Sequence, residues 1–322
     1  MSRPSAPPPW LVVLIYLAGT VLLGAFLAPW IFQLGKGYAA WCARSGHENT
    51  FLLGSLSREA VKADFPRYFN RSILLAAILL FAAAKRLLNV RRAELPGLIP
   101  RSGDLVQAGS GFLTAALPLL AMGLLLGWLG VFRIDPKTPW PSTLAPAALA
   151  AVSVSLLEEW LFRGALTTVV SRTLAPKAVL VFIALLFASL HFLVPPEDWS
   201  PPAEGIGPLT GFSLAGVILA RPATPGFYTA AFPTLIAVAF LLGWARLATG
   251  RLWLGIGLHA GWVFALKAFS AATRRLPLRK HGVPEWLIGD DLRSGLLPLA
   301  FLGLTSLVIW WWLRRQAPVN DE

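Results

Sequence analysis

The stretch from Ser153 to Ala165 reads Ser-Val-Ser-Leu-Leu-Glu-Glu-Trp-Leu-Phe-Arg-Gly-Ala and places three charged side chains in an apolar run. That run extends from about Leu144 to Val170, long enough for a helix that crosses a bilayer. Glu159 and Arg163 are four residues apart, so on a helix they share a face and can form an ion pair. Glu158 lies about 100° around the same helix and does not share that partner.

Charged side chains at membrane depth are costly, so they indicate either a paired structural cluster or a functional site. Two interpretations are therefore open. The three side chains can form a buried polar cluster that holds a helix bundle together. Alternatively, Glu159 is structural, through its pair with Arg163, and Glu158 is available for chemistry.

The composition of the whole chain indicates a membrane protein. Of its 322 residues, 56% are hydrophobic and 14% are charged, whereas a soluble domain carries about 25% charged residues. Several apolar runs approach or exceed the roughly 20 residues that a spanning helix needs. We therefore predict an all-α polytopic membrane helix bundle with about eight transmembrane helices.

The predicted spans cover about residues 10–34, 68–84, 105–132, 144–170, 178–194, 227–247, 252–269 and 295–313. We also expect a short surface helix near 57–65 and a short apolar segment at 209–220, too short to span. The predicted division is 1–143 for N-terminal membrane helices, 144–270 for a helical core that contains Glu158 and Glu159, and 271–322 for a basic loop with the last transmembrane helix. Eight spans place both termini on one side, which is the cytoplasmic side if the basic loop at 85–101 is cytoplasmic.

The net charge of +12 does not indicate a nucleic-acid partner. The basic residues lie mostly in short loops such as Lys85–Arg92, where they face lipid headgroups, so the expected partners are membrane lipids. Cys42 is the single cysteine, which excludes an internal disulfide and a multi-cysteine metal cluster. The Ala-, Leu-, Arg- and Pro-rich composition suggests a bacterial source and hence the inner cell membrane.

Two of the four histidines, His191 and His259, fall within apolar spans. Together with Glu158 and Glu159 they form a carboxylate–imidazole set on three helices, and helix bundles build sites in this way. A carboxylate can act as general base toward water, and an imidazole can orient that water or stabilise an oxyanion. A single buried histidine is more often structural, but two beside a glutamate favour a site.

Other intramembrane hydrolase types fit the sequence less well. The His-Glu-x-x-His motif of zinc proteases is absent, and every aspartate is expected in a loop or tail. Ser110, between two glycines, is the one candidate nucleophilic serine, and small residues at such spacing are more simply helix-packing positions.

Three motifs on three separate spans occur in a characteristic order. They are Glu158-Glu159-x-x-x-Arg163, Phe187-x-x-x-His191, and the stretch from Gly243 to His259 that ends Gly-Ile-Gly-Leu-His. They resemble the CPBP family, which comprises the type II CAAX prenyl endopeptidases and bacterial bacteriocin-processing or abortive infection membrane proteins. The resemblance covers about residues 144–269.

The resemblance implies an eight-helix membrane peptidase in which a glutamate activates water. It implies a catalytic set of Glu158, Glu159, Arg163, His191 and His259, and substrate contacts from Phe187, Trp262 and Val263. On that pattern Glu158 is the base, His191 helps to hold the water and His259 lies at the oxyanion. Glu159 pairs with Arg163 to set the helix, and Phe187 shapes the pocket.

The sequence departs from the family pattern at Val263, because the family usually carries asparagine four residues after the histidine. We expect an intramembrane endopeptidase without a cofactor or metal, acting on a peptide or protein with a hydrophobic segment. Two alternatives are open: a catalytically inactive immunity or scaffold protein, which Val263 favours, and a proton-coupled transporter with buried glutamates as relays.

Overall fold

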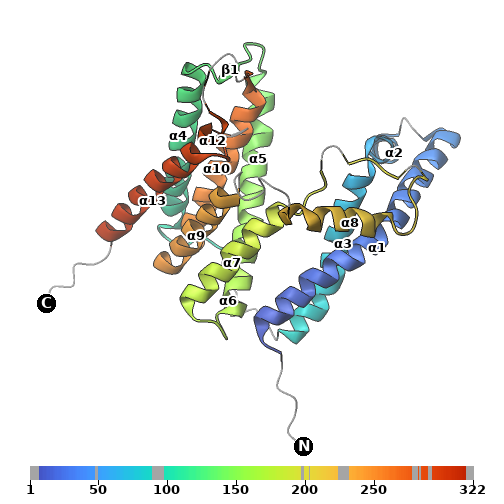
Figure 1. The fold of residues 1–322 in the computed structure, drawn as a ribbon, viewed down its shortest axis with the longest axis horizontal. Coiled ribbons are helices and arrows are strands. Elements are labelled where there is room, and N and C mark those ends of the chain that lie inside the picture. Colours follow the sequence, from blue (N-terminus) through green and yellow to red (C-terminus); the bar gives the residue numbers. More distant parts are fainter. Residues whose placement is uncertain are drawn as a thin grey trace, which may run out of the picture. The chain divides into compact units, whose positions relative to one another are not determined.

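The computed structural model describes residues 7–47, 50–88, 98–196, 199–202, 204–223, 232–277, 282, 284–288 and 292–316. Within these ranges, seven helices are long and apolar enough to cross a membrane, judged by length and composition (Figure 1). The prediction of an all-α polytopic membrane bundle is confirmed.

Six of the long helices are α1 (Pro9–Arg44), α3 (Phe65–Leu87), α4 (Asp104–Trp128), α9 (Phe232–Thr249), α10 (Trp253–Ala272) and α13 (Leu296–Gln316). The seventh continues from α5 (Trp140–Glu158) through the π-helix η3 (Glu159–Leu166) into α6 (Thr167–Val170). The shorter elements are α2 (Phe51–Lys62), α7 (Pro176–His191), α8 (Thr210–Ala220), η4 (Arg221–Ala223), α12 (Glu285–Ile288) and the strands β1 (Phe132–Ile134) and β2 (Thr273–Arg275).

These bounds correct several predicted limits. The helix α7, counted as the fifth span, has 16 residues and is shorter than the seven spanning candidates. Helix α3 begins before the predicted residue 68 because the Asp64 carboxylate accepts a hydrogen bond from the Arg67 amide and caps the first turn. Asp104, expected in a loop, is the first residue of α4. Residues 227–231 of the predicted sixth span lie outside the described ranges.

The chain forms two compact units by residue contacts. The first comprises Met1–Val90 and His191–Thr224, and the second comprises Arg91–Leu190 and Pro225–Glu322. The three-part division made from the sequence stays a prediction.

In the first unit, α1 packs against α2, α3 and α8. A Cβ atom on Gly211 would overlap the carbonyl of Ala25, so glycine permits the backbones of α8 and α1 to meet there. Lys36 donates from Nζ to the carbonyls of Ala60, Val61 and Ala63 and so satisfies acceptors that the end of α2 leaves unpaired.

In the second unit, α4 and α10 run parallel and in close contact. A Cβ atom on Gly111 would lie 2.7 Å from the Leu254 carbonyl oxygen. Cβ atoms on Gly257 and Gly261 would overlap the carbonyls of Ala108 and Phe112. Small residues at such contacts let membrane helices approach through their backbones.

Both ends of this helix pair are tied. At the N-terminal ends, Arg251 donates from Nε to Asp104 Oδ1 at 3.0 Å and also pairs with Oδ2. At the C-terminal ends, β1 and β2 pair antiparallel, with Phe132 opposite Arg275. Helix α10 is therefore fixed along its length, and it also packs on α5 and α9.

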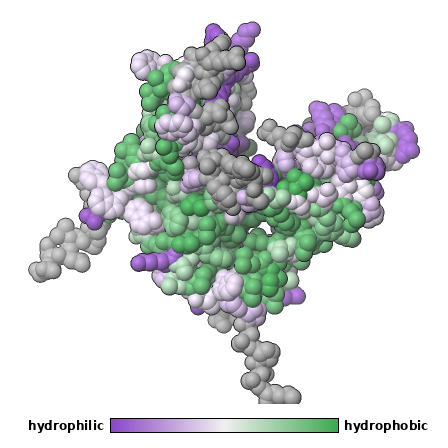
Figure 2. Space-filling model, in the orientation of Figure 1, coloured by the Kyte–Doolittle hydropathy of each residue, from purple (hydrophilic) through white to green (hydrophobic). Residues whose placement is uncertain are grey.

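The long helices expose many apolar side chains. Leu74, Ile78 and Leu79 on α3 and Leu124 on α4 are each more than half exposed. Figure 2 shows large hydrophobic areas on the visible surface. Such surfaces are expected where lipid is the solvent.

Candidate active site

Glu158 and Glu159 lie at the point where the fourth predicted span changes from an α-helix to a π-helix. Helix α5 ends at Glu158, and residues Glu159–Leu166 form a π-helix before α6. The Thr167 hydroxyl donates to the Phe162 carbonyl at 2.8 Å, and Arg246 Nε on α9 donates to the Arg163 carbonyl at 3.4 Å. Single π-helical turns inside α-helices are frequent at functional sites.

The predicted ion pair between Glu159 and Arg163 is confirmed. Arg163 Nη1 donates to Glu159 Oε1 at 3.0 Å, and the two side chains are 0% and 1% exposed. Arg163 Nη2 also donates to the Ala239 carbonyl on α9 at 3.3 Å. The buried cation therefore has two oxygen partners, which offsets the cost of removing it from water.

Aromatic rings pack on the same guanidinium. The Arg163 guanidinium carbon lies 4.4 Å from the centroid of the Phe187 ring on α7 and 5.9 Å from that of Phe162. The two rings meet edge to face at 5.1 Å. Phe187 is buried and contacts Arg163, Phe162 and His259. Its contact with substrate stays a prediction.

His259 lies between the two glutamates. Its Nδ1 is 3.0 Å from Glu159 Oε1, and its Nε2 is 3.8 Å from Glu158 Oε2. Because an ionised carboxylate only accepts hydrogen bonds, we assign a proton to Nδ1. The Nε2 atom then accepts a hydrogen bond when the ring is neutral and donates one when the ring is protonated.

The two acids differ in access to solvent. The Glu158 side chain is 29% exposed, whereas that of Glu159 is 1% exposed. Glu159 binds both Arg163 and His259. The Glu158 side chain is therefore less enclosed than that of Glu159, although its Oε2 atom, which faces His259, is buried.

The remaining predicted residues are placed as follows. Trp262 is buried in the apolar core around Leu242 and Leu258, and Val263 is partly buried. Both follow His259 on α10 by three and four residues and so lie near its face. His191 is the last residue of α7 and falls in the first unit. The roles predicted for these three residues stay predictions.

The sequence also predicted that the site holds no metal. Among the described residues, no group of three or more His, Cys, Asp and Glu side chains has the arrangement of a metal site. Arg163 next to Glu159 would further disfavour a cation there. The metal-free site stays a prediction.

Sequence reasoning missed two partners from α9. Arg246 is an arginine within an apolar span, and an intramembrane arginine is a recognisable signal for a site or its support. The Ala239 carbonyl gave no signal, because every residue carries the same backbone acceptor.

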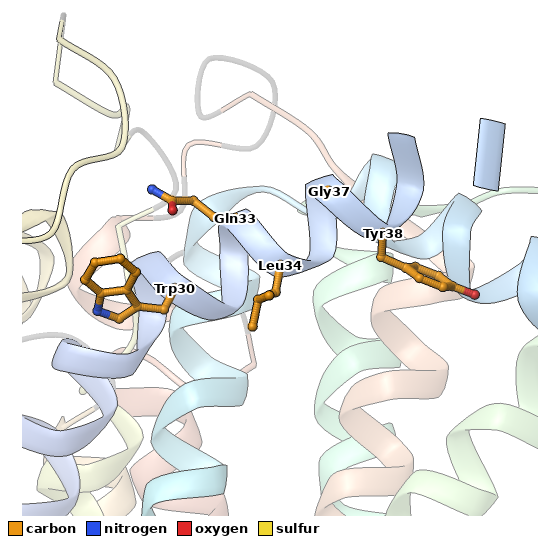
Figure 3. A pocket seen from close by; sticks show the side chains of 5 residues that line it. All are labelled: Trp30, Gln33, Leu34, Gly37 and Tyr38. Atoms are coloured by element: carbon orange, nitrogen blue, oxygen red, sulfur yellow. The ribbon is translucent and has the colours of Figure 1, made fainter. Parts of the chain in front are cut away.

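A shallow hollow of about 430 Å³ lies on α1 in the first unit (Figure 3). It is lined by Trp30, Gln33, Leu34, Gly37 and Tyr38, which recur at helical spacing on one face of α1. None of the predicted site residues lines it.

The fold and the charged cluster define a class: polytopic helical membrane proteins with a buried carboxylate–imidazole–guanidinium site. The family model described as Type II CAAX prenyl endopeptidase Rce1-like matches residues 139–265, which include Glu158, His191 and His259. The matched segment is thus similar to the type II CAAX prenyl endopeptidases, the family that the three motifs resemble. The family is a protease family. No curated protein and no solved structure matches the chain.

Proposed function

We propose that this protein is an intramembrane endopeptidase in which Glu158 activates a water molecule for attack on a peptide bond. The observation that carries the proposal is the imidazole of His259 between the carboxylate of Glu158, whose side chain is partly exposed, and the buried carboxylate of Glu159. A carboxylate base next to a group that can donate a proton is the arrangement that hydrolysis of an amide requires.

In the proposed reaction, Glu158 accepts a proton from water while the water oxygen bonds to the substrate carbonyl carbon. The carbonyl oxygen becomes negative, and a protonated His259 can donate to it from Nε2. Glu158 then delivers its proton to the leaving nitrogen as the carbon–nitrogen bond breaks. His191 is proposed to help hold the water.

The proposed substrate is a membrane-associated protein or peptide with a hydrophobic segment. Such a segment can enter between lipid-facing helices and bring its peptide bond to the depth of Glu158. The proposed location is a bacterial inner membrane, with lipids as the surrounding partners and no role for nucleic acid.

The test uses the full chain in liposomes with a library of hydrophobic-tailed peptides, some ending in a prenylated CAAX sequence. Mass spectrometry identifies the new peptide ends. We expect cleavage by the wild type, none by Glu158→Gln, and wild-type cleavage by Glu59→Gln, a control at an exposed glutamate on α2. Both variants should melt like the wild type.

Cleavage by Glu158→Gln at the wild-type rate would exclude Glu158 as the base. If the wild type cleaves no peptide in the library, the peptidase proposal fails. Proton-coupled uptake by the same vesicles would then identify a transporter, and its absence would favour the inactive scaffold that Val263 suggests.

A further inference from the structure

Helix α10 carries a glycine one turn before His259, and this glycine faces the buried acid. A Cβ atom on Gly255 would lie 3.0 Å from Glu159 Oε2 and 3.8 Å from the carboxyl carbon. The other oxygen of the same carboxylate, Oε1, binds His259 and Arg163. The Glu159 carboxylate thus lies against a full turn of α10, from residue 255 to residue 259.

We propose that Gly255 is a positioning residue for the site. Because it has no side chain, it leaves the space in which the Glu159 carboxylate can hydrogen-bond to His259 Nδ1. This inference rests on the proposed function of Glu158 and His259. A methyl group at residue 255 would push Oε2 away from α10. Because the carboxylate is rigid, Oε1 would turn away from Nδ1, and the ring would lose the partner that fixes its proton and its direction toward Glu158.

The surroundings of Gly255 separate this role from helix packing. Gly257 and Gly261 on the same helix face the backbone of α4, where a side chain would overlap carbonyl groups. Beyond Glu159, the nearest atom to a Cβ on Gly255 is Leu242 Cδ2, at 3.9 Å. Alanine is also the better helix former, so a weaker helix cannot explain a loss of activity in Gly255→Ala.

The experiment compares Gly255→Ala, Glu159→Asp and the double variant with the wild type. Aspartate is shorter by one methylene group, so it makes room for the new methyl group. The control is Gly109→Ala on α4, where a Cβ would meet no atom within 4 Å. The first readout is the ¹⁵N spectrum of labelled histidine in the detergent-solubilised full chain, which has four histidines, with His259 assigned from His259→Gln.

In the wild type, we expect a His259 signal typical of a ring held with its proton on Nδ1. Gly255→Ala should shift this signal toward that of a freely exchanging ring, and Gly109→Ala should leave it unchanged. The second readout is cleavage of a library peptide that the wild type cuts. Since a 1 Å misplacement can cost roughly 100-fold in rate, a shift of about 0.3 Å should lower kcat about four-fold at unchanged KM.

The double variant should be more active than the product of the two single effects predicts, because aspartate relieves the new contact. Unchanged His259 signals and kcat in Gly255→Ala would overturn the inference, as would purely multiplicative effects in the double variant. The spectrum needs no substrate. Suppose that the wild type cleaves nothing, that Gly255→Ala shifts the His259 signal, and that the double variant restores it. This result would support the positioning role of Gly255 and overturn the peptidase function.

Discussion

Replacing Glu159 with glutamine removes the charge that faces Arg163 without changing the shape of the side chain. The guanidinium is 0% exposed, and it would keep the Ala239 carbonyl, the rings of Phe187 and Phe162, and a neutral amide oxygen in place of the carboxylate. Breaking a buried pair costs about 3–5 kcal/mol in the free energy of unfolding. The glutamine oxygen can still accept from His259, so we expect a value near 3 kcal/mol, at the low end of that range.

Arg163→Leu makes the complementary change and leaves the Glu159 carboxylate buried with His259 as its partner. It also removes the cation–π contact with Phe187, worth about 2 kcal/mol when desolvated. We therefore expect a larger loss, about 5 kcal/mol. The double variant Glu159→Gln/Arg163→Leu leaves no charge from this pair, so it should be more stable than Arg163→Leu alone.

The assay is unfolding in mixed micelles with increasing dodecyl sulfate, followed by tryptophan fluorescence. The matched control is Arg274→Gln, because Arg274 is 81% exposed in its pair with Asp135. That variant should show no measurable change. The reasoning is refuted if both single variants unfold like the wild type, or if the double variant loses the sum of the two single losses.

Three further predictions concern metal, the oxyanion side and helix packing. Purified protein should contain no stoichiometric zinc, and chelators should leave activity intact; metal lost together with activity would contradict this. Val263→Ala should keep most activity, because valine donates no hydrogen bond, whereas His259→Ala should remove it. A lost oxyanion donor costs about 2.7–4 kcal/mol of transition-state stabilisation, and full activity in His259→Ala would exclude the donor role. Gly257→Val should abolish the monodisperse peak in size-exclusion chromatography, because its side chain would overlap the Ala108 carbonyl. Gly109→Val should keep that peak, and a normal peak from Gly257→Val would show that α4 and α10 need no such close contact.

The sequence alone determined the features that depend on neighbouring residues of the chain, namely the positions of the long helices and the contacts within one helix. The length of an apolar run limits where a spanning helix can form, so the described ends of most long helices lie within about four residues of the prediction. The end of α1 was predicted wrongly, because the helix continues from the predicted residue 34 to Arg44. The pairing of Glu159 with Arg163 also follows from helical spacing, because residues four apart share a face. Three motifs in a fixed order were enough to indicate the resemblance to the family whose model matches residues 139–265.

Only the tertiary structure decided which groups meet across helices. Glu159 and His259 are 100 residues apart, and no spacing rule predicts that the first would bind Nδ1 of the second. The Ala239 carbonyl could not be predicted as a partner of Arg163, because every residue has a backbone carbonyl. The π-helix at 159–166 is defined by backbone hydrogen bonds that the side-chain sequence does not predict. In the sequence, Gly255 is one of several small residues in an apolar span. Its proposed role depends on the packing that places the Glu159 carboxylate against it.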